Sequence, residues 1–367
     1  MLSLNLPHNP RIDEIRWLAA SLVFFFHFYH HVYAPPIEVL AHPGWTPFSL
    51  VTEGHTGVGL FFTLSGFLFM QIALYQAEQR KGLVYREFIR NRFLRIFPLF
   101  ITVFVIAISI GRDAFRPQDA LYVLFSNLGE SPTSKYFITG AAWTISVEFA
   151  FYLVFPFIAR FTLAQGPRYL LQCLGLMLAF KLAAYGVSER STHMLFSTLV
   201  GRFDQFLVGM LAAVVHARFG QELRRHGKVW LLLAALLVTG NIMLQARYAS
   251  FFLPEPKQAF WITWSLQESL AWSVFILGWL AADLRLPRPL ARAMQHGGDI
   301  SFSLYLLHAL VIDLVAQALG KPSWTGQRIV DGLLLAAIAY AATWAVSSLS
   351  YATIEKPFLQ LRRRYAQ

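Results

Sequence analysis

The first residues that invite a chemical interpretation are an arginine and a histidine within one apolar stretch, Arg16-Trp-Leu-Ala-Ala-Ser-Leu-Val-Phe-Phe-Phe-His27. Eleven positions make about three helical turns, so the two side chains share one face of a predicted helix, about 16 Å apart along its axis. Ionisable groups inside a bilayer are costly and usually serve an ion, a proton or a substrate. Arg16 is therefore a candidate anion-binding residue and His27 a candidate proton-transfer residue, with hydrogen-bonded packing as the alternative for the histidine.

The elements that must position these residues are transmembrane helices. Hydrophobic residues make up 56% of the 367 residues and charged residues only 14%, whereas soluble proteins carry about 25% charged residues. Apolar runs long enough to cross a bilayer recur along the chain. The sequence predicts an all-α polytopic membrane protein, one bundle of about ten transmembrane helices, at residues 15–33, 56–75, 96–111, 144–163, 169–187, 194–217, 229–246, 260–282, 300–319 and 329–351.

Charge segregation supports this count, because cytoplasmic loops accumulate Lys and Arg. Alternate ends of the ten segments hold 21 of the 31 basic residues, and the opposite ends hold eight. This pattern predicts that both termini are cytoplasmic, and it accounts for the net charge of +11 without a role in nucleic-acid binding. The longest gap between predicted helices is about thirty residues, so we expect one membrane domain, 1–367, with no appended soluble domain.

Cysteine and histidine usage gives no sign of a metal centre. The single cysteine, Cys173, rules out an intramolecular disulfide and a cysteine-cluster metal site. His30 and His31 are adjacent in a predicted helix, where their side chains diverge, and no third ligand is specified. We therefore predict no metal site and no bound cofactor.

Six sequence blocks, in order and covering nearly the whole chain, together resemble the acyltransferase-3 family of integral-membrane O-acyltransferases. They are the segment from Arg16 to His27, Gly57-Val-Gly-Leu-Phe-Phe-Thr-Leu-Ser-Gly-Phe67, Arg92-Phe-Leu-Arg-Ile-Phe-Pro98, Trp143-Thr-Ile-Ser-Val-Glu-Phe-Ala-Phe-Tyr152, Ser301-Phe-Ser-Leu-Tyr-Leu-Leu-His308 and Glu355-Lys-Pro-Phe358. The resemblance implies transfer of an acyl group, usually from cytoplasmic acyl-CoA, to a hydroxyl of a carbohydrate or related envelope or exported molecule. It also implies an Arg-x10-His signature essential for activity, matched by Arg16 and His27, and an Arg-x-x-Arg pair, matched by Arg92 and Arg95. A multi-pass protein of the bacterial cytoplasmic membrane is the corresponding expectation.

Acyl transfer to an alcohol needs a base near the hydroxyl, and imidazole has a suitable unperturbed pKa. His27 is the candidate general base, and a covalent acyl-imidazole is the alternative. Arg16 either holds a phosphate or carboxylate of the donor or binds a carboxylate of the bundle and positions the first helix. Its spacing from His27 fits both roles.

Arg92 and Arg95 stand at positions i and i+3, on the same side of a helix that enters the membrane at about Ile96. Together they form a candidate binding site for the polyanionic end of coenzyme A. Topology alone also places basic residues at this point. Ser65, beside Gly66, is a candidate for lining the acyl channel, and packing is the alternative.

Four further intramembrane residues carry expectations, and two of them, Glu148 and His308, have two interpretations each. The family match makes Glu148 an active-site candidate that orients an imidazole or an acceptor hydroxyl, or else pairs with a cation such as Arg202. His308 lies in one of the matched blocks, and a structural hydrogen bond is favoured over catalysis. Arg202 and Asp204 point in different directions from one helix, so we expect each to find a partner on another helix.

Two other classes of function fit the composition. A transporter or flippase for an envelope precursor also needs buried charges along its solute path. It does not need the Arg16 and His27 arrangement, and an inverted repeat that would favour it is not visible. A non-catalytic scaffold would tolerate loss of His27. Transfer from acyl-CoA by the purified protein separates the three classes.

Overall fold

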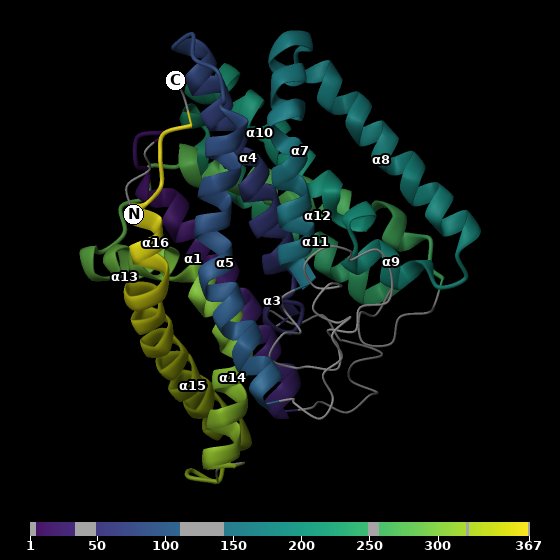
Figure 1. Ribbon diagram of the computed structural model, residues 1–367. Helices are drawn as coiled ribbons and strands as arrows, with labels where there is room; N and C mark the ends of the chain where they lie inside the picture. Colours follow the sequence, from purple (N-terminus) through teal and green to yellow (C-terminus); the bar gives the residue numbers. More distant parts are fainter. Residues whose placement is uncertain (1–4, 34–48, 111–142, 249–256, 321–322, 366–367) are drawn as a thin grey trace.

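The computed structural model describes residues 5–33, 49–110, 143–248, 257–320 and 323–365, and these form helices and no β-sheet (Figure 1). The helices are α1 (Pro10–Phe28), η1 (Tyr29–Tyr33), α3 (Ser49–Thr52), α4 (Thr56–Glu78), α5 (Tyr85–Ile110), α7 (Trp143–Gln165), α8 (Pro167–Val187), α9 (Ser191–Ser197), α10 (Leu199–Arg225), α11 (Gly227–Tyr248), α12 (Phe260–Ala281), α13 (Arg288–Asp299), α14 (Ser301–Leu319), α15 (Arg328–Ser350), η5 (Tyr351–Glu355) and α16 (Lys356–Gln360). The predicted all-α class is confirmed.

Every predicted membrane segment falls on a long helix. Eight helices in the described part of the chain are long and apolar enough to cross a membrane: α4, α5, α7, α8, α10, α11, α14 and the helix that begins in α15. The remaining two segments correspond to α1 and α12, which carry buried acids such as Glu14 and Glu268. The chain is therefore a multi-pass membrane protein in which the carboxylates of α1 and α12 are turned inward.

The observed helices differ from the predicted membrane segments in three places. Helix α5 begins at Tyr85, well before the predicted start at Ile96, because its first turns are basic and lie at the end of the bundle. The sixth predicted segment is divided between α9 and α10 at Thr198, whose hydroxyl caps α10 by accepting from the Gly201 amide. The amphipathic helix α13 is too polar to be recognised as a membrane span.

The centre of the bundle is the close contact between α4 and α10. A Cβ atom at Gly66 would lie 2.0 Å from the Phe206 carbonyl oxygen, and one at Gly209 would lie 2.0 Å from that of Thr63. Small residues on both helices thus let the two backbones approach, as is common between membrane helices. This supports the packing interpretation of the glycines around Ser65, which lies inside α4 and not in a turn.

Arg202 and Asp204 find partners on other helices, which confirms that expectation. The Lys181 ammonium of α8 lies 2.5 Å from Asp204 of α10, and Ser265 of α12 donates to the same carboxylate at 2.9 Å. Arg202 of α10 pairs with Glu268 of α12 at 3.2 Å. These buried contacts join three helices in the half of the bundle away from the chain ends.

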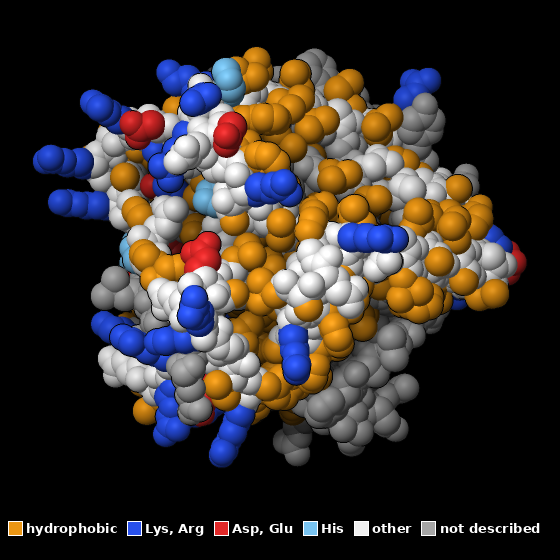
Figure 2. All heavy atoms as spheres, turned by 90° about the horizontal axis from the view of Figure 1, so that it is seen from above, with side chains coloured by type: hydrophobic (Ala, Val, Ile, Leu, Met, Phe, Trp, Pro, Cys, Tyr) orange, Lys and Arg blue, Asp and Glu red, His pale blue; other side chains and the backbone are white. Residues whose placement is uncertain are grey.

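Both chain ends lie at one end of the bundle. The Tyr365 amide donates to Asn5 Oδ1 at 2.8 Å, and the Val84 amide, between α4 and α5, donates to the Tyr365 carbonyl at 2.8 Å. Seen from this end, basic side chains gather over part of the surface with few acids among them (Figure 2). The exposed ones include Arg80, Lys81, Arg86, Arg224, Arg225, Arg363 and Arg364. The termini therefore share a side, and that side is basic.

Candidate active site

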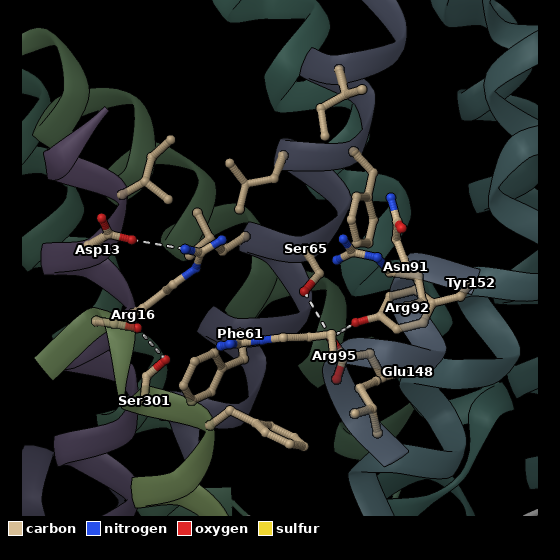
Figure 3. Close-up of a pocket in the computed structure, with 18 of the residues that line it drawn as sticks. Asp13, Arg16, Phe61, Ser65, Asn91, Arg92, Arg95, Glu148, Tyr152 and Ser301 are labelled. Carbon is tan, nitrogen blue, oxygen red and sulfur yellow. Dashed lines mark hydrogen bonds and ion pairs between the residues drawn. The ribbon is translucent and has the colours of Figure 1, made fainter. Parts of the chain in front are cut away.

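A cavity of about 240 Å³ opens at the end of the bundle where the termini lie. Its wall is built by α1, α4, α5, α7, the end of α13 and α14, and by residues that precede α1 and follow α16. Five of the six candidate site residues line it: Arg16, Ser65, Arg92, Arg95 and Glu148 (Figure 3). The structure thus brings together residues that are up to 132 positions apart in the sequence.

The start of α1 holds Arg16 at this cavity. Asn9 caps the helix by accepting from the Arg11 amide at 3.1 Å, and Pro10 occupies the first helical position. One turn further, Asp13 lies 2.9 Å from the Arg16 guanidinium. Asp13 is therefore the carboxylate expected if Arg16 positions the first helix. The Arg16 side chain nevertheless stays 37% exposed and lines the cavity.

Arg92 and Arg95 both reach the cavity from α5, as their spacing predicts. Arg95 lies 3.1 Å from Glu355, a carboxylate that also accepts from Ser303. Arg92 has no carboxylate within 4 Å among the described residues. It donates to the Tyr365 hydroxyl and lies against aromatic rings, the nearest centroid being that of Phe69 at 4.9 Å. Arg92 is consequently the cation best placed to bind an anion from outside.

Glu148 lies on the same side of the cavity as Arg92 and Arg95, across from Arg16, and it accepts two hydrogen bonds (Figure 3). Ser65 of α4 donates to it at 3.2 Å, and Tyr152, one turn further along α7, donates to the same oxygen (Figure 3). The alternative pairing of Glu148 with Arg202 is wrong, because Arg202 lies against Glu268. Ser65 therefore lines the cavity as a hydrogen-bond donor to Glu148. The sequence did not suggest this contact.

His27 does not line the cavity, although it shares a helix face with Arg16. Its Nδ1 lies 2.9 Å from the Val23 carbonyl oxygen and 3.1 Å from Nε2 of His308 on α14. His308 Nδ1 in turn lies 2.6 Å from the Tyr305 carbonyl oxygen. The two imidazoles form a pair between α1 and α14, which supports the hydrogen-bonding interpretation of His308.

The hydrogen bonds of an uncharged pair fix the tautomer of His27. His308 Nδ1 must donate to the Tyr305 carbonyl, which leaves His308 Nε2 as an acceptor. His27 Nδ1 must then carry the proton and share it between Val23 and His308. The lone pair of His27 is therefore on Nε2, and that atom makes no hydrogen bond with a described residue. This is the arrangement that a general base requires.

Tyr305 connects the two parts of the site. Its side chain lines the cavity, where its hydroxyl lies 3.0 Å from the Thr144 hydroxyl, and its ring packs against Phe61 with centroids 5.9 Å apart. Its carbonyl accepts from His308, whose ring centroid is 4.8 Å from that of His27. Tyr305 therefore contacts both the cavity and the histidine pair, its ring centroid lying 6.0 Å from that of His308.

Sequence reasoning missed several residues of the cavity wall. Tyr152 and Tyr305 lie inside two of the family blocks, at positions i+4 from Glu148 and i−3 from His308, so helical spacing could have selected them. Arg362 and Tyr365 follow the last helix; Arg362 carried only a topological signal, and Tyr365 carried none. The candidate metal ligands do not converge: His30 lies 2.8 Å from the Thr52 carbonyl oxygen and His31 3.3 Å from Asp313.

Comparison with known proteins identifies the family. The model of a family described as "Acyltransferase domain" matches residues 9–352, so the chain belongs to the acyltransferase-3 family and is a membrane acyltransferase. Relatives include acyltransferase MdmB of Streptomyces mycarofaciens, 25% identical over 97% of this chain and 93% of its own length, and nodulation protein 10 of Rhizobium leguminosarum bv. viciae, 26% identical over 97% and 94%. Peptidoglycan O-acetyltransferase OatA of Listeria monocytogenes is 24% identical over 95% of this chain and 55% of its own length. No solved structure matches the chain.

Proposed function

We propose that the chain is an O-acyltransferase that moves an acyl group from cytoplasmic acyl-CoA to a hydroxyl of a carbohydrate or a related envelope or exported acceptor. The observation that carries this proposal is the arginine-lined cavity at the basic end of the bundle, with a histidine pair behind it. A glycan acceptor is supported by the relative named as a peptidoglycan O-acetyltransferase. The basic end is then the cytoplasmic face of a bacterial inner membrane, and both termini are cytoplasmic.

The donor enters the cavity with its phosphates towards Arg92. Arg16 and Arg95 already face Asp13 and Glu355, so they add positive potential and hydrogen bonds while Arg92 supplies the uncompensated charge. Guanidinium groups bind phosphate with paired hydrogen bonds. The pantetheine arm separates these phosphates from the thioester, and the arm runs inward along α1 in the direction of His27.

In the transfer step, His27 Nε2 takes the proton of the acceptor hydroxyl while the hydroxyl oxygen attacks the thioester carbonyl. The carbon–oxygen bond forms, the carbon–sulfur bond breaks, and the imidazolium returns the proton to the leaving thiolate. The products are an ester and free CoA, and the histidine is regenerated. His308 holds the reactive tautomer of His27 through the 3.1 Å contact with Nδ1. The covalent acyl-imidazole remains the competing pathway, and an acyl group trapped on the protein without acceptor would identify it.

We propose that the thioester reaches His27 through a movement of Phe61 or Tyr305, because both side chains line the cavity and the Tyr305 ring also packs against His308, with centroids 6.0 Å apart. Donor binding is thus coupled to a side-chain rearrangement. Glu148 and its partners Ser65 and Tyr152 form the polar wall beside this passage. We propose that Glu148 orients polar groups of the donor or of the acceptor in this passage.

The test uses purified protein, isotopically labelled acetyl-CoA and glycans extracted from a deletion strain, which contain the acceptor in its unmodified form. We expect acceptor-dependent CoA release and label in the glycan fraction, and mass spectrometry would identify the modified sugar. Repeating the assay with succinyl-CoA and longer acyl-CoAs defines the acyl group. If no acyl-CoA supports transfer while vesicles containing the protein move glycans across the bilayer, the function is that of a transporter or flippase.

A further inference from the structure

The C-terminal tail, residues 361–365, folds back onto the donor cavity. Asn91 of α5 donates to the Arg363 carbonyl at 2.6 Å and accepts from the Arg363 amide at 3.0 Å. Tyr365 is 1% exposed, and its backbone is bound to both Asn5 and Val84. The segment is thus held at Arg363 and at Tyr365, and Arg362 directly precedes the residue that is bound to α5.

Two side chains of the tail contribute to the cavity wall. The Tyr365 hydroxyl accepts from Arg92 and its ring lies 5.7 Å from the same guanidinium. Arg362 lines the cavity, and its Nε donates to the Leu359 carbonyl at 2.9 Å. The tail therefore contacts Arg92 through Tyr365 and adds Arg362 to the cavity wall.

Arg362 lies in a strongly positive environment. Burial and the neighbouring guanidinium groups of Arg92 and Arg95 lower the pKa of Arg362 to about 10. The group still carries its charge at neutral pH, so its guanidinium and that of Arg92 repel each other, while Arg95 faces Glu355. An anion bound beside Arg92 and Arg362 would reduce this repulsion.

We propose that Arg362 is a further donor-binding residue, which contacts a phosphate group of coenzyme A beside Arg92, and that Tyr365 is a positioning residue for Arg92. This inference rests on the proposed use of acyl-CoA as donor. It differs from the topological interpretation of the basic tail, in which any of its arginines is equivalent. Arg364 supplies the comparison, because it is exposed and does not line the cavity.

The experiment compares Arg362→Gln with Arg364→Gln, which remove the same charge two residues apart. Binding of acetyl-CoA, of its 3′-dephospho form and of acetyl-pantetheine would be measured on purified protein by calorimetry. We expect Arg362→Gln to weaken acetyl-CoA binding about tenfold, the value for one partly exposed charge-assisted hydrogen bond, and Arg364→Gln to leave it within about twofold. Acetyl-pantetheine should bind both variants equally, because it has no phosphate. A smaller effect of Arg362→Gln on the dephospho form would identify the 3′-phosphate as the contacted group.

Arg362→Lys and Tyr365→Phe keep the test decisive if Arg362→Gln is unstable. Lysine should recover part of the lost affinity, and Tyr365→Phe should weaken acetyl-CoA binding without affecting acetyl-pantetheine. Equal affinities for Arg362→Gln and Arg364→Gln, together with tight binding by the parent protein, would overturn this inference alone. Failure of the parent protein to bind any acyl-CoA would instead refute the proposed donor.

Discussion

Replacing His308 by phenylalanine tests the idea that this residue acts through His27. Phenylalanine keeps the ring volume at a fully buried position of α14 but removes the Nε2 acceptor that lies 3.1 Å from His27 Nδ1. The His27 proton then retains one acceptor, the Val23 carbonyl at 2.9 Å. The reactive tautomer should therefore be weakened and not lost.

The size of the effect follows from that contact. A net hydrogen bond between neutral groups is worth about 0.5–1.5 kcal/mol, so His308→Phe should reduce turnover by about two- to tenfold. Removing the base itself in His27→Ala should reduce turnover by about 10²–10⁴-fold. In the double variant the loss should equal that of His27→Ala alone, because His308 has no base left to orient.

The assay is CoA release from acetyl-CoA in the presence of extracted acceptor, on detergent-purified variants of matched thermal stability. Acetyl-CoA affinity should stay unchanged in all three variants, since neither histidine lines the cavity. A further loss of turnover when His308→Phe is added to His27→Ala would show that His308 takes part in the reaction directly. That result would refute the positioning role.

Three other predictions concern binding, stability and topology. Arg92→Gln should raise the Kd of acetyl-CoA by about 10- to 100-fold, as expected for a charge-assisted contact, with only partial rescue by lysine. Arg90→Gln, on the same helix but outside the cavity wall, is its control, and equal effects would return both residues to a topological role. Lys181→Met should lower the free energy of unfolding by about 3–5 kcal/mol by leaving the Asp204 carboxylate unpaired, and Lys181→Met with Asp204→Leu should recover most of the loss; a double variant as unstable as the single one would argue against the ion pair. Reporter fusions should indicate the outer face after Ala34, Pro132 and Pro256 and the cytoplasm after Gly82, Arg225 and Gln367; an outer signal at Gln367 would break the ten-helix topology.

The helices were predictable because they depend on patterns of hydropathy and charge among residues that are neighbours in the sequence. The ten segments all correspond to helices, and the i, i+3 spacing correctly placed Arg92 and Arg95 on one side of α5. Four of the six topology probes, Ala34, Pro132, Pro256 and Gln367, lie outside the described residues. Which side of the membrane holds the termini therefore stays a prediction.

The separation of His27 from the cavity was not predictable from periodicity. Helical spacing puts Arg16 and His27 on one face, but it does not say which side chains cover that face between them. Here Tyr305, contributed by α14, lines the cavity, and its carbonyl accepts from His308. The return of Tyr365 to Arg92 is equally a tertiary contact, since 273 positions separate the two residues in the sequence.

The most direct test of the account is acceptor-dependent CoA release by His27→Gln compared with the parent protein. Glutamine keeps a hydrogen-bonding side chain but cannot accept a proton near neutral pH, so a protein that still binds acetyl-CoA normally should lose nearly all transfer. The expected loss is about 10²–10⁴-fold, the usual contribution of a positioned general base. Near-normal turnover by His27→Gln would contradict the central claim and direct attention to Glu148 or His308 as the catalytic group.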